Sequence, residues 1–167
     1  DTVIVRDRKP FCLVDTAGIR KFRGAADTRE KAGIIKAKMN IGSADVICLV
    51  LDARDFPTRQ DAHIAQLAKE SGKSMLIVLN KWDLVESERV DPEAVRRLVR
   101  TKLGFVSYAP LLFISARTGQ RVIKILDKAE EVYRKLAAES PEAHTLHYNL
   151  GLICFKLGRL EDALSSF

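Results

Sequence analysis

The apolar run Leu76–Leu79 is followed by three polar side chains and a tryptophan, with Asn80, Lys81 and Asp83 as the polar residues. Such a run is typical of a buried parallel strand, and ligands bind at the carboxyl ends of strands in open α/β sheets. The Asp83 carboxylate could accept hydrogen bonds from the N1–H and N2–H₂ groups of guanine, which adenine does not offer. Sites of this kind reject the analogue that lacks the bonding groups by roughly 10⁴–10⁵-fold. The sequence therefore predicts a guanine site, in which Asn80 braces the loop and Lys81 lies over the purine face.

Two other apolar runs end in residues that suit the same ligand. Asp15 and Gly18 follow one of them, and Ser115 and Ala116 follow the other. A carboxylate at Asp15 can hold Mg²⁺, usually through water, and Gly18 lets a backbone N–H approach a terminal phosphate. Backbone N–H groups around Ala116 can donate to the guanine O6. The alternative interpretation of each segment is a strand that ends in a polar turn.

The elements that would position these residues alternate along the chain. We expect strands at 2–6, 11–14, 44–51, 75–79 and 111–114, and helices at 29–41, 58–70, 91–103 and from about 121. The first two strands are separated by a turn containing Pro10 and suit a hairpin. Strands that alternate with helices of this length predict an α/β fold with a mostly parallel sheet and right-handed crossovers.

Composition sets broad limits on function. The chain is 47% hydrophobic and 30% charged, with a net charge of +6 and a pI near 9.3. This charge permits a surface that faces nucleic acid but does not establish one, because the basic residues are scattered. No apolar run is long enough to span a membrane, so we expect no membrane partner. Cys12, Cys48 and Cys154 lack metal-ligand spacing, which favours reduced thiols in a cytoplasmic protein.

Three of these segments resemble motifs of the P-loop GTPases. Asp15-Thr-Ala-Gly18 is similar to their third motif, Asn80-Lys-Trp-Asp83 to the fourth and Ser115-Ala116 to the fifth, in the family's order. The sequence around these motifs resembles the second G domain of the Der (EngA) GTPases over residues 1–126. The resemblance includes the segment Phe113-Ile-Ser-Ala-Arg-Thr-Gly-Gln-Arg-Val122.

The resemblance implies a P-loop GTPase fold, GTP or GDP and Mg²⁺ as ligands, and a role in assembly of the large ribosomal subunit, with the ribosome or rRNA as partner. Asp15 and Gly18 would serve the γ-phosphate, with Asp15 at the metal. Asn80, Lys81, Asp83, Ser115 and Ala116 would bind guanine.

The chain departs from the family pattern at two points. Ile19 stands where Ras-like enzymes have the Gln that orients the attacking water, which implies the class with a hydrophobic substitution. No G-x-x-x-x-G-K-[ST] run occurs, and the first strand of the fold should be missing with it. We therefore expect the neighbouring strands to have open edges. We assign no catalytic residue, and we expect that this chain alone neither hydrolyses GTP nor binds it tightly.

The last forty residues resemble a different family. Ala129 and Tyr133 are followed 34 residues later by Ala163 and Phe167, which is the period of tetratricopeptide (TPR) repeats. This spacing predicts a domain boundary near 126, with residues 127–167 forming an α-helical TPR-like tail. The tail would include a helix over about 143–157 and would offer a site for a protein partner. The alternative is an ordinary helical hairpin.

Two other interpretations of the whole chain stay open. The first is a non-catalytic interaction module, in which the TPR-like tail recruits a protein and the G domain serves as a scaffold. The second is an artefact that joins two unrelated reading frames.

Overall fold

A computed structural model describes residues 2–15, 41–139 and 148–154 of the 167-residue chain. In these ranges the strands are β1 (Thr2–Arg6), β2 (Lys9–Asp15), β3 (Val46–Asp52), β4 (Ser74–Asn80), β5 (Leu111–Phe113) and β6 (Tyr148–Cys154). The helices are α2 (Arg59–Glu70), α3 (Trp82–Glu86), α4 (Pro92–Lys102) and α5 (Lys124–Glu139), with a 3₁₀ turn, η1, at Gly104–Val106.

The strands form one sheet in the order β1-β2-β6-β3-β4-β5. β2, β6, β3, β4 and β5 run parallel to one another, whereas β1 pairs with β2 as an antiparallel hairpin. The predicted α/β fold with a mostly parallel sheet is thereby confirmed. In the register of β3 and β4, Asp52 pairs with Asn80, so polar residues of both strands reach the same edge.

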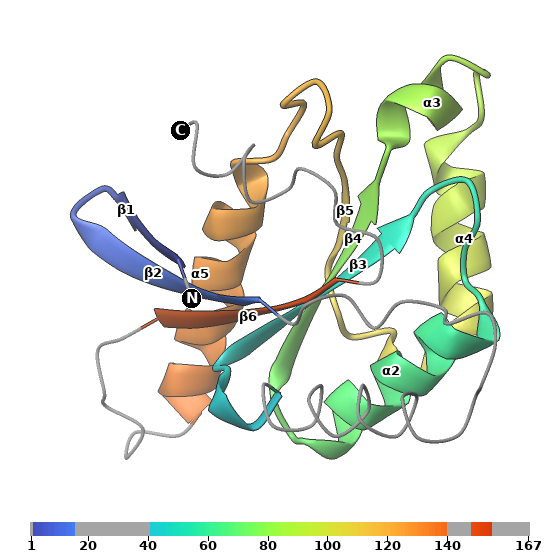
Figure 1. Ribbon diagram of the computed structural model, residues 1–167. Coiled ribbons are helices and arrows are strands. Elements are labelled where there is room, and N and C mark those ends of the chain that lie inside the picture. The colour runs from blue at the N-terminus through green and yellow to red at the C-terminus, as the bar shows by residue number, and fades with distance from the viewer. Residues whose placement is uncertain (1, 16–40, 140–147, 155–167) are drawn as a thin grey trace, which may run out of the picture.

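Helices cover the two faces of the sheet, as Figure 1 shows, with α5 on one face and α2 and α4 on the other. Alternate residues of β3 and β4 therefore enter different cores. Leu49 and Ile77 pack with α2 and α4, whereas Cys48 and Val78 pack with α5. Burial on both faces explains why these strands are almost entirely apolar. No helix in the described ranges combines the length and the apolar character that crossing a bilayer requires.

The helix starts predicted at 58 and 91 agree with the structure, whereas the helix predicted from about 121 begins at Lys124. Thr58 caps α2 in a capping box with Asp61, and Asp91 caps α4 by accepting from the N–H groups of Glu93 and Ala94. The short helix α3 was not predicted, because five residues are too few for a periodic pattern. The helix predicted over 29–41 lies, except for its last residue, outside the described residues.

The expectation for the tail was wrong over residues 148–154. The predicted helix is a strand there, and β6 lies between β2 and β3. The expectation of open edges on those two strands was therefore wrong as well, since both pair with β6. A short apolar run suits a buried strand or a buried helix equally, and only the available place in the sheet distinguishes them. α5 crosses the boundary predicted near 126 and packs on the sheet, while residues 155–167 lie outside the described part.

Candidate functional site: the carboxyl edge of β4 and β5

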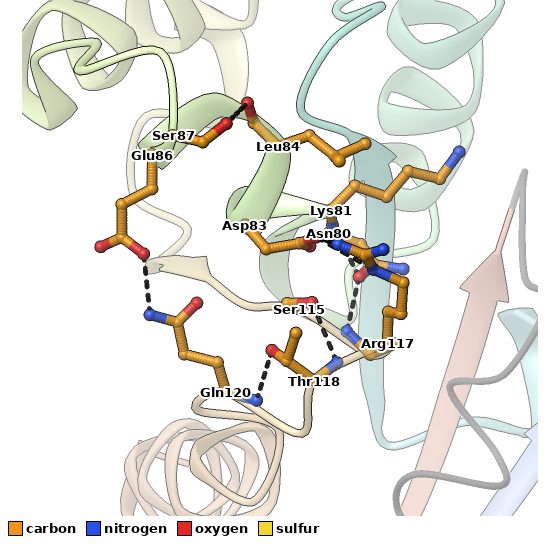
Figure 2. A network of polar contacts seen from close by, with 11 residues as sticks. Asn80, Lys81, Asp83, Leu84, Glu86, Ser87, Ser115, Arg117, Thr118 and Gln120 are labelled. Atoms are coloured by element: carbon orange, nitrogen blue, oxygen red, sulfur yellow. Dashed lines mark hydrogen bonds and ion pairs between the residues drawn. The ribbon is translucent and has the colours of Figure 1, made fainter.

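Asp83 lies in the first turn of α3, just beyond the carboxyl end of β4 (Figure 2). The preceding Lys81 adopts a left-handed conformation, with φ 65°, which turns the chain sharply from the strand into the helix. The side chain of Asp83 is only 13% exposed. Its Oδ1 is buried and has no hydrogen-bond partner among the described residues. Buried carboxylate oxygens are normally paired. The neighbouring Ser115 hydroxyl also acts on this carboxylate, but a carboxylate oxygen has two lone pairs and can still accept from a ligand that carries an N–H or O–H group.

Asn80 joins the two loops of the site. It is buried, and its Oδ1 accepts from the backbone N–H of Lys81 at 2.7 Å and from that of Ala116 at 2.9 Å. This is the bracing role that the sequence suggested. The Ala116 N–H, one of the backbone groups expected to donate to the guanine O6, donates to Asn80 in this structure.

The loop after β5 supplies the groups that surround the Asp83 carboxylate. Arg117 donates to Asp83 Oδ2 from Nε at 3.1 Å and from Nη2 at 2.5 Å. Ser115 is fully buried, and its hydroxyl accepts from the Thr118 N–H at 3.2 Å. The Ser115 hydroxyl, followed by Arg117, holds the pKa of Asp83 below its ordinary value of 3.8, although burial opposes the shift. Asp83 is therefore ionised at neutral pH, which a hydrogen-bond acceptor for guanine requires.

The Lys81 ammonium has a carboxylate partner that the sequence analysis missed. Its Nζ lies 2.8 Å from Oδ2 of Asp52, the last residue of β3, and the Asp52 side chain is only 9% exposed. Asp52 Oδ1 also accepts from the Arg54 N–H at 3.1 Å. The position of Asp52 at the end of an apolar run could have marked it as a candidate site residue. Its pairing with Lys81 could not be predicted, because it depends on β3 and β4 being neighbours in the sheet. The pair fixes the direction of the Lys81 stem along the strand ends.

Aromatic packing beneath the site holds the two loops together. Trp82 is 1% exposed, and its ring centroid lies 4.3 Å from that of Phe113. The backbone N–H of Trp82 donates to the backbone carbonyl of Ile114 at 2.9 Å, which ties the start of α3 to the end of β5. Gln120 and Glu86 add a side-chain hydrogen bond of 3.0 Å between the same two segments. Asp83 and the Ser115–Gln120 loop therefore keep a fixed separation.

The phosphate end of the predicted site is only partly within the described residues. The backbone of Asp15 ends β2, which points toward the same edge of the sheet as β4. Three strand spacings separate β2 from β4, about 14 Å across the sheet. The Asp15 side chain and Gly18 lie outside the described part, so their roles at the γ-phosphate and Mg²⁺ stay predictions. Among the side chains that are described, no three acidic, His or Cys groups gather as a metal site would require.

Comparisons with known proteins agree with this geometry. Residues 1–81 match the family described as "50S ribosome-binding GTPase". The chain is 40% identical over 135 residues to GTPase Der of Caldanaerobacter subterraneus, covering 81% of this chain and 31% of that protein. It is 45% identical over 127 residues to GTPase Der of Ruminiclostridium cellulolyticum, covering 76% and 29%. The chain thus spans about 30% of the length of these curated relatives.

A crystal structure of a probable GTP-binding protein engB has the same fold, with a TM-score of 0.53 at 17% identity. It covers 68% of this chain and 73% of that one. The sheet order and this likeness show that the chain has the α/β fold of a P-loop GTPase G domain. The sequence relatives, which are GTPases named Der, support a G domain of the Der (EngA) type in this chain.

Proposed function

We propose that this chain binds guanine nucleotides through the loops that follow β4 and β5, with Asp83 selecting the base. The observation that carries the proposal is the Asp83 carboxylate, which is ionised, mostly buried and has one oxygen without a hydrogen-bond partner among the described residues. Guanine carries adjacent N–H donors at N1 and N2 that match the two carboxylate oxygens. Adenine would leave the buried oxygen unpaired, which is costly.

The other residues have supporting roles in this proposal. Asn80 keeps the loops together, Lys81 extends along the purine face while Asp52 holds its ammonium, and the buried Ser115 keeps Asp83 ionised. Backbone N–H groups near Ala116 donate to the guanine O6. The Ala116 N–H keeps its bond to Asn80 and reaches O6 as a bifurcated donor. The ligand is GDP or GTP, with Mg²⁺ at Asp15 and the γ-phosphate at Asp15 and Gly18.

For the protein of which this G domain is part, we propose GTP hydrolysis coupled to assembly of the large ribosomal subunit. The matched family is described as ribosome-binding, and the relatives are named GTPase Der. The net charge of +6 is compatible with ribosomal RNA as partner. A protein partner for the tail predicted over residues 127–167 stays a prediction.

The test is a comparison of bases on the 167-residue chain. GMP and AMP are titrated against the ¹⁵N-labelled protein while the amide signals of Lys81, Asp83 and Ala116 are followed by NMR. We expect GMP to shift these signals and AMP to leave them unchanged, and Asp83→Ala to abolish the GMP response. Equal responses to the two nucleotides, or an unchanged response in Asp83→Ala, would overturn the proposal.

A further inference from the structure

Arg117 covers the carboxylate that the proposed function assigns to guanine. Nε and Nη2 of its guanidinium both donate to Asp83 Oδ2, at 3.1 and 2.5 Å, while Oδ1 receives no bond from the described residues (Figure 2). A guanidinium is a planar group with adjacent N–H donors. The N1–H and N2–H₂ edge of guanine is also planar and has adjacent donors, so the two groups compete for the same acceptor.

We propose that Arg117 closes the base site of the nucleotide-free chain and that guanine displaces it from Asp83. The inference rests on the proposed function, because it requires Asp83 to be the base-recognition residue. Arg117 then sets the affinity for guanine, because it occupies the acceptor that guanine needs.

The exposure of the two side chains determines which of them moves. The side chain of Arg117 is 68% exposed, whereas that of Asp83 is 13% exposed. Asp83 is also fixed by its neighbour Trp82, which is buried against Phe113. Rotation of the Arg117 side chain into solvent breaks no other hydrogen bond that the structure shows for it. Displacement therefore frees the acceptor without moving α3.

The backbone on either side of Arg117 stays in place during this exchange. The Ala116 N–H is held by Asn80, and the Thr118 N–H is held by the Ser115 hydroxyl. The Gln120 side chain bonds to Glu86 on α3. Opening of the site is accordingly a side-chain rotation and not a loop movement.

The size of the effect follows from the exposure of the ion pair. Pairs in which one partner is largely solvated contribute little, and their loss changes an equilibrium by about 1.5- to 5-fold. Guanine must break this pair before it binds, so removing Arg117 should raise the affinity for guanine by that factor. A residue that instead contacted the bound nucleotide would have the opposite effect on affinity when removed.

The experiment compares the wild-type 167-residue chain with Arg117→Ala and a matched control. Arg97→Ala is the control, because Arg97 is also an exposed arginine paired with an aspartate, Asp91, which is the N-cap of the helix α4 that contains Arg97. GMP is titrated at neutral pH and low salt, with AMP as the negative ligand. We expect Arg117→Ala to bind GMP about 1.5- to 5-fold more tightly, and Arg97→Ala to bind like the wild type.

A second measurement needs no nucleotide. The side-chain carboxyl signal of Asp83 is followed by ¹³C NMR as a function of pH. Because Arg117 lowers the pKa of Asp83, Arg117→Ala should raise that pKa and Arg97→Ala should leave it unchanged.

The outcomes separate this inference from the proposed function. Unchanged or weaker GMP binding by Arg117→Ala overturns the displacement, and an unchanged Asp83 pKa overturns the ion pair on which it depends. Absence of GMP binding by all three proteins overturns the proposed function and this inference together. Binding by the wild type that Arg117→Ala weakens overturns the inference alone.

Discussion

At the scale of single residues, the site depends on the hydrogen-bonding capacity of one side chain. Asp83 presents two acceptors in a mostly buried position, and only one of them is paired within the described residues. The identity of the acceptor group should therefore determine which purine binds. Shape alone discriminates weakly between purines, because they differ little in size.

Asp83→Asn should change the preferred base from guanine to xanthine. The amide replaces one acceptor by a donor, which opposes the N2–H₂ group of guanine but matches the O2 acceptor of xanthine. We expect GMP affinity to fall at least about tenfold and XMP to bind more tightly than GMP. Titration of the variant with both nucleotides checks this, and a retained preference for GMP would contradict it.

At the scale of elements, ion pairs connect the hairpin to the helix on the face of the sheet. Glu130 of α5 accepts from Lys9 of β2 and pairs with Arg134 at 2.5 Å, and its side chain is 20% exposed. Lys9 first, with Arg134, holds the pKa of Glu130 below its ordinary value of 4.5. The neighbouring Glu131 pairs with Lys128 and Lys135, both on α5 itself.

Glu130→Gln should lower the free energy of unfolding at pH 7 by about 0.5–1 kcal/mol. Because the folded state lowers the Glu130 pKa, its contribution is complete above pH 4.5 and is lost as the pH falls through the folded-state value. The difference from the wild type should thus shrink on acidification. Urea unfolding between pH 7 and pH 3 measures it.

Glu131→Gln serves as the control. Because the ion pairs of Glu131 stay within α5, this substitution should lower the free energy of unfolding by less than Glu130→Gln does. If the two variants lost equal stability, or if the Glu130→Gln difference persisted in acid, the bridge between β2 and α5 would not be stabilising.

Also at this scale, Trp82 links the strand ends to α3. It is 1% exposed and packs on Phe113, so Trp82→Ala should leave a cavity and cost about 3–5 kcal/mol of stability. Thermal unfolding followed by circular dichroism measures the loss. A change in unfolding temperature no larger than that of an exposed substitution such as Tyr108→Ala would contradict the packing described here.

At the scale of the whole molecule, the sheet is completed by the far end of the chain. β6 pairs with β2 on one side and β3 on the other, so residues 148–154 hold the hairpin to the rest of the sheet. Strand-like Cα and Cβ chemical shifts and slow amide exchange are expected for these residues in NMR spectra. Helical shifts at the same positions would support the TPR-like interpretation and contradict the strand.

The 167-residue chain should bind GTP no more than about tenfold more tightly than GMP. It contains no G-x-x-x-x-G-K-[ST] run, so the backbone cradle and lysine that neutralise the β- and γ-phosphates are not supplied by these residues. Isothermal titration with both nucleotides tests this. Sub-micromolar GTP affinity, or GTP turnover by this chain, would refute it.

Much of the fold could be predicted because apolar runs with polar ends are a local property of the sequence. The strands at β3, β4 and β5, the helix starts at Thr58 and Asp91, and the polar residues after β4 were all identified from patterns of this kind. The family resemblance added the order of the motifs, and the comparisons support it.

The remainder depended on contacts between distant segments. The sequence of Tyr148–Cys154 is compatible with a helix or a strand. It forms a strand because it lies between β2 and β3, whose backbone N–H and C=O groups require hydrogen-bond partners. The sequence by itself determined which side chains could recognise a purine. Only the tertiary structure decided that Asp52 holds Lys81 and that Arg117 covers Asp83, because ion pairs between residues 29 and 34 positions apart depend on which strand ends are adjacent.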